Sequence, residues 1–251
     1  MKIKLIDYTG IGNPNKRFAA ELLVFTKQTR LNMSPDLMYE ISKWSDEKLS
    51  QEIEYMSNTI PSSWEFCNYT FILTGCTRAF THQLVRNRHG SYAQQTMRVL
   101  NVEGFSYEIG PSIETDDNLT AQYCDTMATL NAEYKELIEN GAKIEDARGI
   151  LPTNIHTNIV CKFNLRTLAE IVSKRSSPRT QGEYREFVEG LADGVIEVHP
   201  WADVFLRNKK QEAAAKLDKF IQGTYDYMGG LPQSQDDVND LLKLVDILRG
   251  N

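Results

Sequence analysis

Arginine is unevenly distributed along this chain, and its surroundings suggest a binding chemistry. No Asp, Glu or Lys occurs between Glu65 and Glu103, although that stretch contains Arg78, Arg86, Arg88 and Arg98. Residues 147–181 contain one acid, Glu170, and four more arginines: Arg148, Arg166, Arg175 and Arg179. A guanidinium stays charged when partly buried, and its planar fork of donors fits phosphate oxygens and the carbonyl edges of bases. The two stretches predict a site for a small anion. The alternative is that these arginines form ion pairs with the acidic terminal parts of the chain.

The densest part of the first stretch is residues 86–98, with the sequence RNRHGSYAQQTMR. Gly90 allows the backbone to turn, and Arg98 closes the segment. Neutral hydrogen-bonding side chains lie between them: Ser91, Gln94, Gln95 and Thr96. Such a loop could surround a phosphate and a heterocycle with main-chain and side-chain donors. The pattern predicts binding of a nucleotide or another anion, and by itself it does not define a reaction.

Composition excludes several other classes of protein. The 28 Lys and Arg against 34 Asp and Glu give a net charge of −6, which is unlike a protein that binds nucleic acid polymers through its overall field. No run approaches the roughly 18 apolar residues of a membrane-spanning helix. Residues 1–7 carry charge where a signal peptide has an apolar stretch. We therefore expect a cytoplasmic protein without a membrane partner.

The cysteines and histidines do not predict a metal centre. The four cysteines form no C-x-x-C pair, and the four histidines form no H-E-x-x-H motif. We therefore expect no bound metal. The cysteines lie in apolar or mixed surroundings, which is typical of buried thiols: Cys67, Cys76, Cys124 and Cys161.

Periodicity and capping residues predict the elements that would position the arginines. Alternation or β-branched and aromatic runs predict three strands, at 2–8, 66–74 and 155–163. Helical spacing and caps predict helices at 18–29, from Pro35, from Ser45, from Thr77, and at 118–140, 164–174, 180–198, 209–222 and 236–248. Residues 89–102 are expected to be irregular or extended. The prediction is an α+β fold, mostly helical with a small central sheet, in a single domain over 1–251.

Several motifs follow one another in an order that resembles the flavin-dependent thymidylate synthase family. The central one is Arg86-Asn87-Arg88 followed by Ser91, Thr96 and Arg98, which resembles the family's Arg-His-Arg signature with its Ser and closing Arg. The other matching segments are Ser62-Ser63-Trp64-Glu65, Gln83, Ala147-Arg148-Gly149-Ile150-Leu151-Pro152, Asn164-Leu165-Arg166, and Arg175 followed by Gln181 and Glu183. They fall within residues 60–205, and 206–251 is expected to be a helical extension.

The resemblance implies a fold, a reaction and its cofactors. Members of the family have an α+β fold and form homotetramers whose subunits share active sites. The implied enzyme is a transferase that converts dUMP to dTMP, with methylenetetrahydrofolate as the carbon donor. NADPH reduces the FAD that supplies the hydride, and no cysteine acts as nucleophile. The demanding redox chemistry belongs to the flavin.

The resemblance also implies a role for individual residues. Arg175 matches the catalytic arginine at the uracil edge, where a cation against N3 and O2 stabilises the anionic ring. Nucleotide contacts are implied for Gln83, Arg86, Gln94, Gln95, Thr96, Arg98, Arg148 and Arg175. FAD contacts are implied for Ser62, Arg86, Asn87, Arg88, Gln94, Asn164, Arg166 and Glu170.

Some positions depart from the family pattern. Asn87 replaces a His and loses its titration, and Gln94 replaces a Glu and removes a negative charge beside the nucleotide. The remaining departures are Thr96 for Ser, Glu170 for Asn, and Ile60 and Arg179 for His. Two alternatives therefore stay open: methylation or hydroxymethylation of another pyrimidine nucleotide on the same scaffold, and a non-catalytic nucleotide-binding module.

Overall fold

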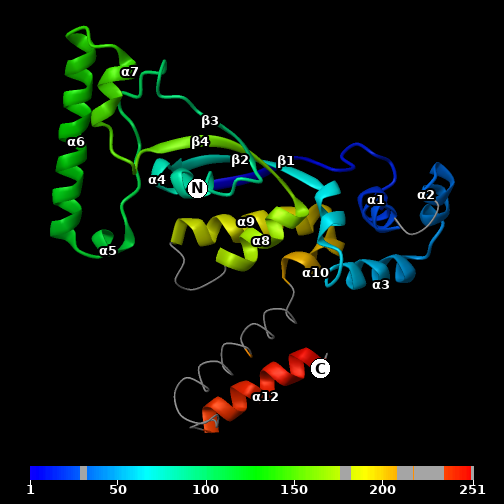
Figure 1. The fold of residues 1–251 in the computed structure, drawn as a ribbon. Helices are drawn as coiled ribbons and strands as arrows, with labels where there is room; N and C mark the ends of the chain where they lie inside the picture. The colour runs from blue at the N-terminus through cyan, green and yellow to red at the C-terminus, as the bar shows by residue number, and fades with distance from the viewer. Residues whose placement is uncertain (29–32, 176–181, 208–216, 218–234, 250–251) are drawn as a thin grey trace. The chain divides into compact units, whose positions relative to one another are not determined.

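The first unit of the chain, Met1–Trp201, is built on a four-stranded antiparallel sheet (Figure 1). The strands lie in the order β1 (Lys2–Tyr8), β2 (Asn68–Thr77), β4 (His156–Asn164) and β3 (Ser91–Gln94). The three longer strands confirm those predicted from the sequence. The short edge strand β3 falls in the segment expected to be irregular or extended.

The computed structural model describes residues 1–28, 33–175, 182–207, 217 and 235–249. Arg179, Gln181 and the helix expected over 209–222 lie outside the described residues, except for residue 217. The chain divides into two compact units, and the second is Ala202–Asn251. The single domain expected over 1–251 stays a prediction.

One face of the sheet is buried along alternate residues, as expected for an antiparallel sheet with one covered face. Tyr69, Phe71 and Leu73 of β2 are fully buried. Helix α9 (Gly182–Val198) lies against this part of the sheet: a Cβ added to Gly190 would lie 2.5 Å from the Ile3 side chain. The absence of a side chain there lets α9 approach β1 closely.

Three helices of the first unit begin at capping residues that the sequence predicts. The Ser34 and Ser45 side chains accept backbone N–H groups of the first turns of their helices. The Asn164 side chain accepts the N–H of Thr167 at 2.8 Å. The helices are α1 (Phe18–Lys27), α2 (Pro35–Ser42), α3 (Asp46–Met56), the 3-10 helix η1 (Pro61–Phe66), α4 (Arg78–Leu84), α5 (Pro111–Glu114), α6 (Asp117–Glu139), α7 (Ile144–Ala147), the 3-10 helix η2 (Arg148–Ile150), α8 (Leu165–Arg175) and α9.

These helices group around different parts of the sheet. Helix α1 contacts α2, α3 and η1, whereas α6 contacts α5, α7 and η2. Helix α8 packs on α9, on β4 and on η1. Arg166 in its first turn contacts Glu65 of η1, and Arg175 at its end contacts Tyr184 in the first turn of α9. Gly141, with φ +89°, follows the end of α6 as the sequence predicts for a C-cap.

The 3-10 helix η3 (Pro200–Ala202) crosses the boundary between the two units, and the second unit contains α10 (Asp203–Leu206) and α12 (Gln235–Arg249). Helix α12 confirms the helix predicted at 236–248. No helix in the described part of the chain is long and apolar enough to span a membrane.

Candidate active site

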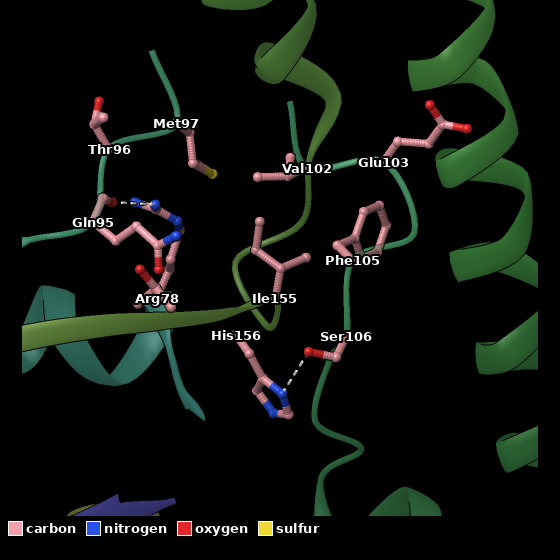
Figure 2. Close-up of a pocket in the computed structure, with 11 residues that line it drawn as sticks. Arg78, Gln95, Thr96, Met97, Val102, Glu103, Phe105, Ser106, Ile155 and His156 are labelled. Carbon is pink, nitrogen blue, oxygen red and sulfur yellow. Dashed lines mark hydrogen bonds between the residues drawn. The ribbon is translucent and has the colours of Figure 1, made fainter. Parts of the chain in front are cut away.

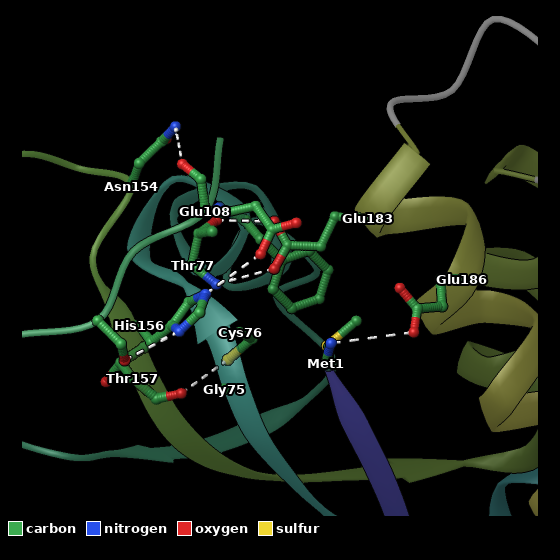
Figure 3. A network of polar contacts seen from close by, with 12 residues as sticks. Met1, Gly75, Cys76, Thr77, Glu108, Asn154, His156, Thr157, Glu183 and Glu186 are labelled. Atoms are coloured by element: carbon green, nitrogen blue, oxygen red, sulfur yellow. Dashed lines mark hydrogen bonds and ion pairs between the residues drawn. The ribbon is translucent and has the colours of Figure 1, made fainter. Parts of the chain in front are cut away.

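The start of α4 is fixed by a carboxylate from α9. The Thr77 hydroxyl oxygen accepts the backbone N–H of Phe80 at 3.0 Å and caps α4. Glu183 accepts the backbone N–H of Thr77 at 2.8 Å and its hydroxyl at 2.7 Å (Figure 3). Hydrogen bonds to an ionised acceptor are stronger than neutral ones. The first turn of α9 is therefore held at the junction of β2 and α4.

The segment Arg86-Asn87-Arg88 follows directly after α4 and is held by two tyrosines. Asn87 Nδ2 donates to the Leu84 carbonyl and to the Tyr184 hydroxyl, both at 2.9 Å. The Tyr92 hydroxyl donates to the Asn87 carbonyl at 2.7 Å. These bonds fix the backbone of the turn from inside the protein.

Gly90 allows the same turn to approach the sheet. A Cβ at this position would lie 2.5 Å from the Tyr92 hydroxyl oxygen and 2.6 Å from a ring carbon of Phe163. Arg86 and Arg88 are exposed, and neither forms an ion pair with a carboxylate of the described residues. The turn thus presents two guanidinium groups whose charge is available to an anion.

Arg175 lies next to this turn through Tyr184. The centre of its guanidinium is 4.8 Å from the centroid of the Tyr184 ring, a cation–π distance. Burial raises the pKa of Tyr184, while hydrogen bonds from Asn87 and Arg175 act in the opposite direction. The proposed catalytic arginine and the Arg86–Arg88 turn therefore contact the same buried side chain.

The next candidates lie where β3 ends. Gln94 Nε2 donates to the Thr81 hydroxyl on α4 at 3.1 Å. The Gln95 side chain accepts from Asn158 Nδ2 at 2.9 Å, and its carbonyl accepts from Arg78 at 2.9 Å. The Gln94 and Gln95 side chains are thus both hydrogen-bonded within the protein. Gln83, half-buried on α4, lies three residues before Arg86.

Glu145 brings Arg98 and Arg148 together. Its carboxylate lies 2.9 Å from Arg98 Nε, and its backbone carbonyl accepts from Arg148 Nε at 3.1 Å. The Thr96 hydroxyl oxygen accepts the Arg98 N–H at 3.0 Å. Thr96, Arg98 and Arg148, for which the resemblance implies nucleotide contacts, therefore form one cluster, although Arg98 and Arg148 lie 50 residues apart in the sequence.

A cavity of about 180 Å³ adjoins this cluster (Figure 2). Gln95 and Thr96 line it together with Arg78 and apolar side chains such as Phe105 and Ile155. Arg78 Nε and the hydroxyl of Thr157, which is 5% exposed, are buried without a hydrogen-bond partner. Burial and the neighbouring Arg148 cation both lower the pKa of Arg78.

Sequence reasoning left Arg78 out of the candidate site. The available signal was its position in a stretch without acidic residues. In the structure, correspondingly, no described carboxylate forms an ion pair with Arg78. The unused donors of Arg78 and Thr157 suit a polar or anionic group better than an apolar one.

Two of the remaining residues matched to FAD contacts, Arg166 and Glu170, form a surface ion-pair network with Glu65. Arg166 NH1 lies 2.7 Å from Glu65 Oε1, and Arg166 Nε lies 3.5 Å from Glu170 Oε1. Asn164 caps α8, and Ser62 is exposed on η1. Arg98 and Arg166 do form ion pairs, but with Glu145, Glu65 and Glu170 in the middle of the chain rather than with acids of its terminal parts. No described carboxylate pairs with Arg86, Arg88 or Arg175.

Within one chain the candidates do not form a single group. Arg166 and Arg175 stand at opposite ends of α8, and at 1.5 Å per residue they are separated by about 14 Å along the helix axis. The Arg98–Arg148 cluster lies at a third place, around Glu145.

The cysteines offer little nucleophilic chemistry. Burial raises the pKa of the Cys67 and Cys161 thiols to about 12 and that of Cys76 to about 11, so these thiols stay protonated. Cys124 is half-buried rather than buried as expected. The described residues include no cluster of three or more His, Cys, Asp or Glu side chains that could hold a metal ion.

Comparisons with known proteins give the family. Residues 4–201 match the family model described as thymidylate synthase complementing protein. The chain is 32% identical over 218 residues to the flavin-dependent thymidylate synthase of Clostridium tetani, covering 80% of this chain and 84% of that protein. The protein of the same name from Sulfolobus acidocaldarius is 33% identical over 205 residues, covering 80% of this chain and 74% of the relative. That from Pyrococcus furiosus is 41% identical over 149 residues, 55% of this chain and 61% of the relative. The chain therefore belongs to the flavin-dependent thymidylate synthase family, a family of transferase enzymes.

Proposed function

We propose that this enzyme converts dUMP to dTMP, using methylenetetrahydrofolate as carbon donor and FAD reduced by NADPH as hydride source. The folate's methylene carbon and one hydride together make the new methyl group. Because the hydride comes from the flavin, the folate leaves as tetrahydrofolate and NADPH becomes NADP⁺.

The observation that carries the proposal is the position of Arg175. Its guanidinium stacks on Tyr184, whose hydroxyl is bonded to the Asn87 side chain of the arginine turn. A cation held there can face the N3 and O2 edge of a uracil ring and stabilise the negative charge that develops when C5 accepts the carbon unit. The supporting evidence is that no described carboxylate neutralises this cation.

The nucleotide's phosphate and sugar would lie at the second cluster. Arg98, Arg148 and Thr96 supply two cations and a hydroxyl around Glu145, and the Arg78 cavity adjoins them. A phosphate binding there would compete with the Glu145 carboxylate for Arg98. Gln83, Gln94 and Gln95 would supply neutral contacts to the sugar and the base.

The donor set of the arginine turn fits the diphosphate of FAD. Arg86 and Arg88 are exposed without a described ion-pair partner, and Gly90 keeps the turn open to close approach. Asn87 would support the turn. Ser62, Asn164, Arg166 and Glu170 would contact another part of the cofactor. Arg166 and Glu170 belong to a separate ion-pair network with Glu65, Asn164 caps the same helix, and Ser62 is exposed on η1. Bound FAD supplies hydride transfer; the protein supplies binding and orientation.

The separation of these groups favours a site shared between subunits. Arg166, matched to an FAD contact, and Arg175, matched to the uracil edge, are about 14 Å apart along α8, and the phosphate cluster is elsewhere. We therefore propose the homotetramer that the resemblance implies, in which neighbouring subunits complete each site.

A second candidate reaction uses another pyrimidine nucleotide on the same scaffold. Gln94 favours it, since its neutral amide donates to Thr81 where the resemblance expects a carboxylate. An amide offers both a donor and an acceptor to a base, so it could accept a ring with an exocyclic amino group. A non-catalytic binding module is not supported, because the family consists of transferases.

The decisive experiment combines an absorption spectrum with product analysis. The purified protein should show flavin bands that bleach with NADPH in the absence of oxygen. It should then convert dUMP, but not UMP or dCMP, to a product 14 mass units heavier in the presence of methylenetetrahydrofolate. Colourless protein that does not bind added FAD would refute the flavin reaction. Turnover of dCMP or UMP in place of dUMP would favour the second candidate.

A further inference from the structure

Tyr184 connects the arginine turn to Arg175, and neither the motifs nor the comparisons assign it a role. Resting on the proposed function, we propose that Tyr184 is a positioning residue: its ring holds the Arg175 guanidinium at the base-binding position, and its hydroxyl couples that cation to the Arg86–Arg88 turn through Asn87.

The Tyr184 ring has a fixed position. It is 1% exposed and packs against the rings of both Phe80 and Phe187, with centroid distances of 5.3 Å and 5.6 Å. The preceding residue, Glu183, is bonded twice to Thr77. A ring held by packing on its sides and by its backbone neighbour is a rigid support for a mobile side chain.

The hydroxyl of Tyr184 is held as firmly as the ring. Asn87 Nδ2 carries two hydrogens, and both are used at 2.9 Å: one by the Leu84 carbonyl and one by the Tyr184 oxygen. The amide therefore cannot turn away without losing two bonds. Since an amide does not titrate and burial keeps the phenol neutral, the connection carries no charge of its own beside Arg175.

Arg175 depends on this support because it lacks a stronger one. It is exposed at the end of α8, and no carboxylate among the described residues pairs with it. Tyr184 contacts it through the ring face, whose centroid lies 4.8 Å from the guanidinium centre, and through the hydroxyl. An aromatic face orients a cation without neutralising it, whereas a carboxylate would lower its affinity for an anionic ring. A positioned but uncompensated cation is what stabilisation of a pyrimidine anion requires.

The test separates the ring from the hydroxyl. Tyr184→Leu removes the ring under Arg175, and Tyr184→Phe keeps the ring and removes the hydroxyl with its hydrogen bonds to Asn87 and Arg175. We expect Tyr184→Leu to lower kcat for dTMP formation by about two- to fivefold, because an exposed cation–π contact contributes a factor of that size. Tyr184→Phe should lower it less, and KM for NADPH should be unchanged in both. Tyr134→Phe is the matched control, since Tyr134 is a fully buried tyrosine on α6 whose hydroxyl has no partner.

A second readout needs neither cofactor nor turnover. Phenylglyoxal modifies accessible guanidinium groups, and its reaction with Arg175 can be followed by peptide mass spectrometry. We expect this labelling to be about two- to fivefold faster in Tyr184→Leu than in wild type or in Tyr134→Phe. Circular dichroism and thermal unfolding identify any variant that fails to fold; in that case Tyr184→Phe alone is compared.

A double-mutant cycle on dUMP binding completes the test. Adding Tyr184→Leu to Arg175→Ala should not weaken dUMP binding further, because a positioning residue acts only through its partner. Unchanged kcat and unchanged labelling in Tyr184→Leu would refute the positioning role while leaving dUMP turnover intact. Failure of the wild type to convert dUMP, with faster labelling in Tyr184→Leu, would refute the proposed reaction and leave the contact established.

Discussion

The burial of His199 leads to a quantitative prediction of how the free energy of unfolding depends on pH. His199 is 3% exposed, its Nδ1 lies 3.0 Å from the Tyr69 hydroxyl, and its ring stacks on Trp201 with a centroid distance of 5.1 Å. A neutral imidazole nitrogen can accept a hydrogen bond from the Tyr69 hydroxyl, whereas a protonated nitrogen cannot. Burial lowers the pKa of His199 from its ordinary 6.5 to about 4. The folded protein therefore holds this histidine neutral at pH values where the unfolded chain protonates it.

The sign of the effect follows from proton counting. Between pH 6.5 and pH 4 the unfolded state binds one more proton at this position than the folded state, so stability falls as the pH falls. The contribution is fully present above pH 6.5 and is lost by about pH 4. A one-unit difference in pKa corresponds to about 1.4 kcal/mol, and these two pKa values give a loss of about 2 kcal/mol between pH 7 and pH 5.

Urea unfolding at pH 7 and pH 5 measures this loss when wild type is compared with His199→Gln. Glutamine does not titrate, while every other ionisable group contributes to both proteins. We expect wild type to lose about 2 kcal/mol more than the variant between the two pH values, at matched protein concentration. His82→Gln, which replaces an exposed histidine, should behave as wild type. Equal pH dependence in wild type and His199→Gln would refute the reasoning; should the variant not fold, an NMR titration of His199 in wild type with a midpoint above pH 6 would do the same.

Three further predictions concern the candidate site. Glu183→Ala removes both bonds to Thr77 and should lower the free energy of unfolding by about 2–4 kcal/mol in urea, whereas Glu186→Ala, one turn later and exposed, should change it by less than about 0.5 kcal/mol. Equal effects of Glu183→Ala and Glu186→Ala would contradict the conclusion that the bonds of Glu183 to Thr77 stabilise the fold. Arg175→Ala should abolish dTMP formation and leave FAD bound, as read from the flavin spectrum; near-normal turnover would show that another group activates the base. Arg78→Met should raise KM for dUMP about tenfold with a smaller effect on kcat, since it removes a charged donor from the cavity; unchanged KM would place the nucleotide elsewhere.

The elements that follow from local sequence signals could be predicted. Ser34, Ser45 and Asn164 cap the helices they were expected to cap, because a capping bond joins residues two or three positions apart. Strand β3 could not be assigned with certainty. It is four residues long, and its pairing with β4 joins residues such as Gln94 and Ile159 that are far apart in the sequence.

The sequence predicted which residues are candidates for the site, but it did not predict which other residues they contact. Motif order gave Asn87 and Arg175, yet nothing in the sequence near them indicates Tyr184, which lies 97 residues after Asn87. The pairing of Arg98 with Glu145 likewise spans 47 residues. Such contacts depend on how α9 and α7 pack against the sheet and α6, and a local pattern does not contain that information.

The division of the arginines into paired and unpaired groups explains how an acidic protein keeps a cationic site. An exposed ion pair contributes at most about 1 kcal/mol to stability, so Arg86, Arg88 and Arg175 lose little by having no carboxylate partner in the described part of the chain. Each of them gains more from an anion that fits its donors, because a charge-assisted bidentate contact is stronger than a solvated ion pair. Arg166, by contrast, is held between Glu65 and Glu170, and that network fixes the end of α8 opposite to Arg175. The carboxylates therefore position the helix that carries the catalytic candidate, and an aromatic ring positions the candidate itself without reducing its charge.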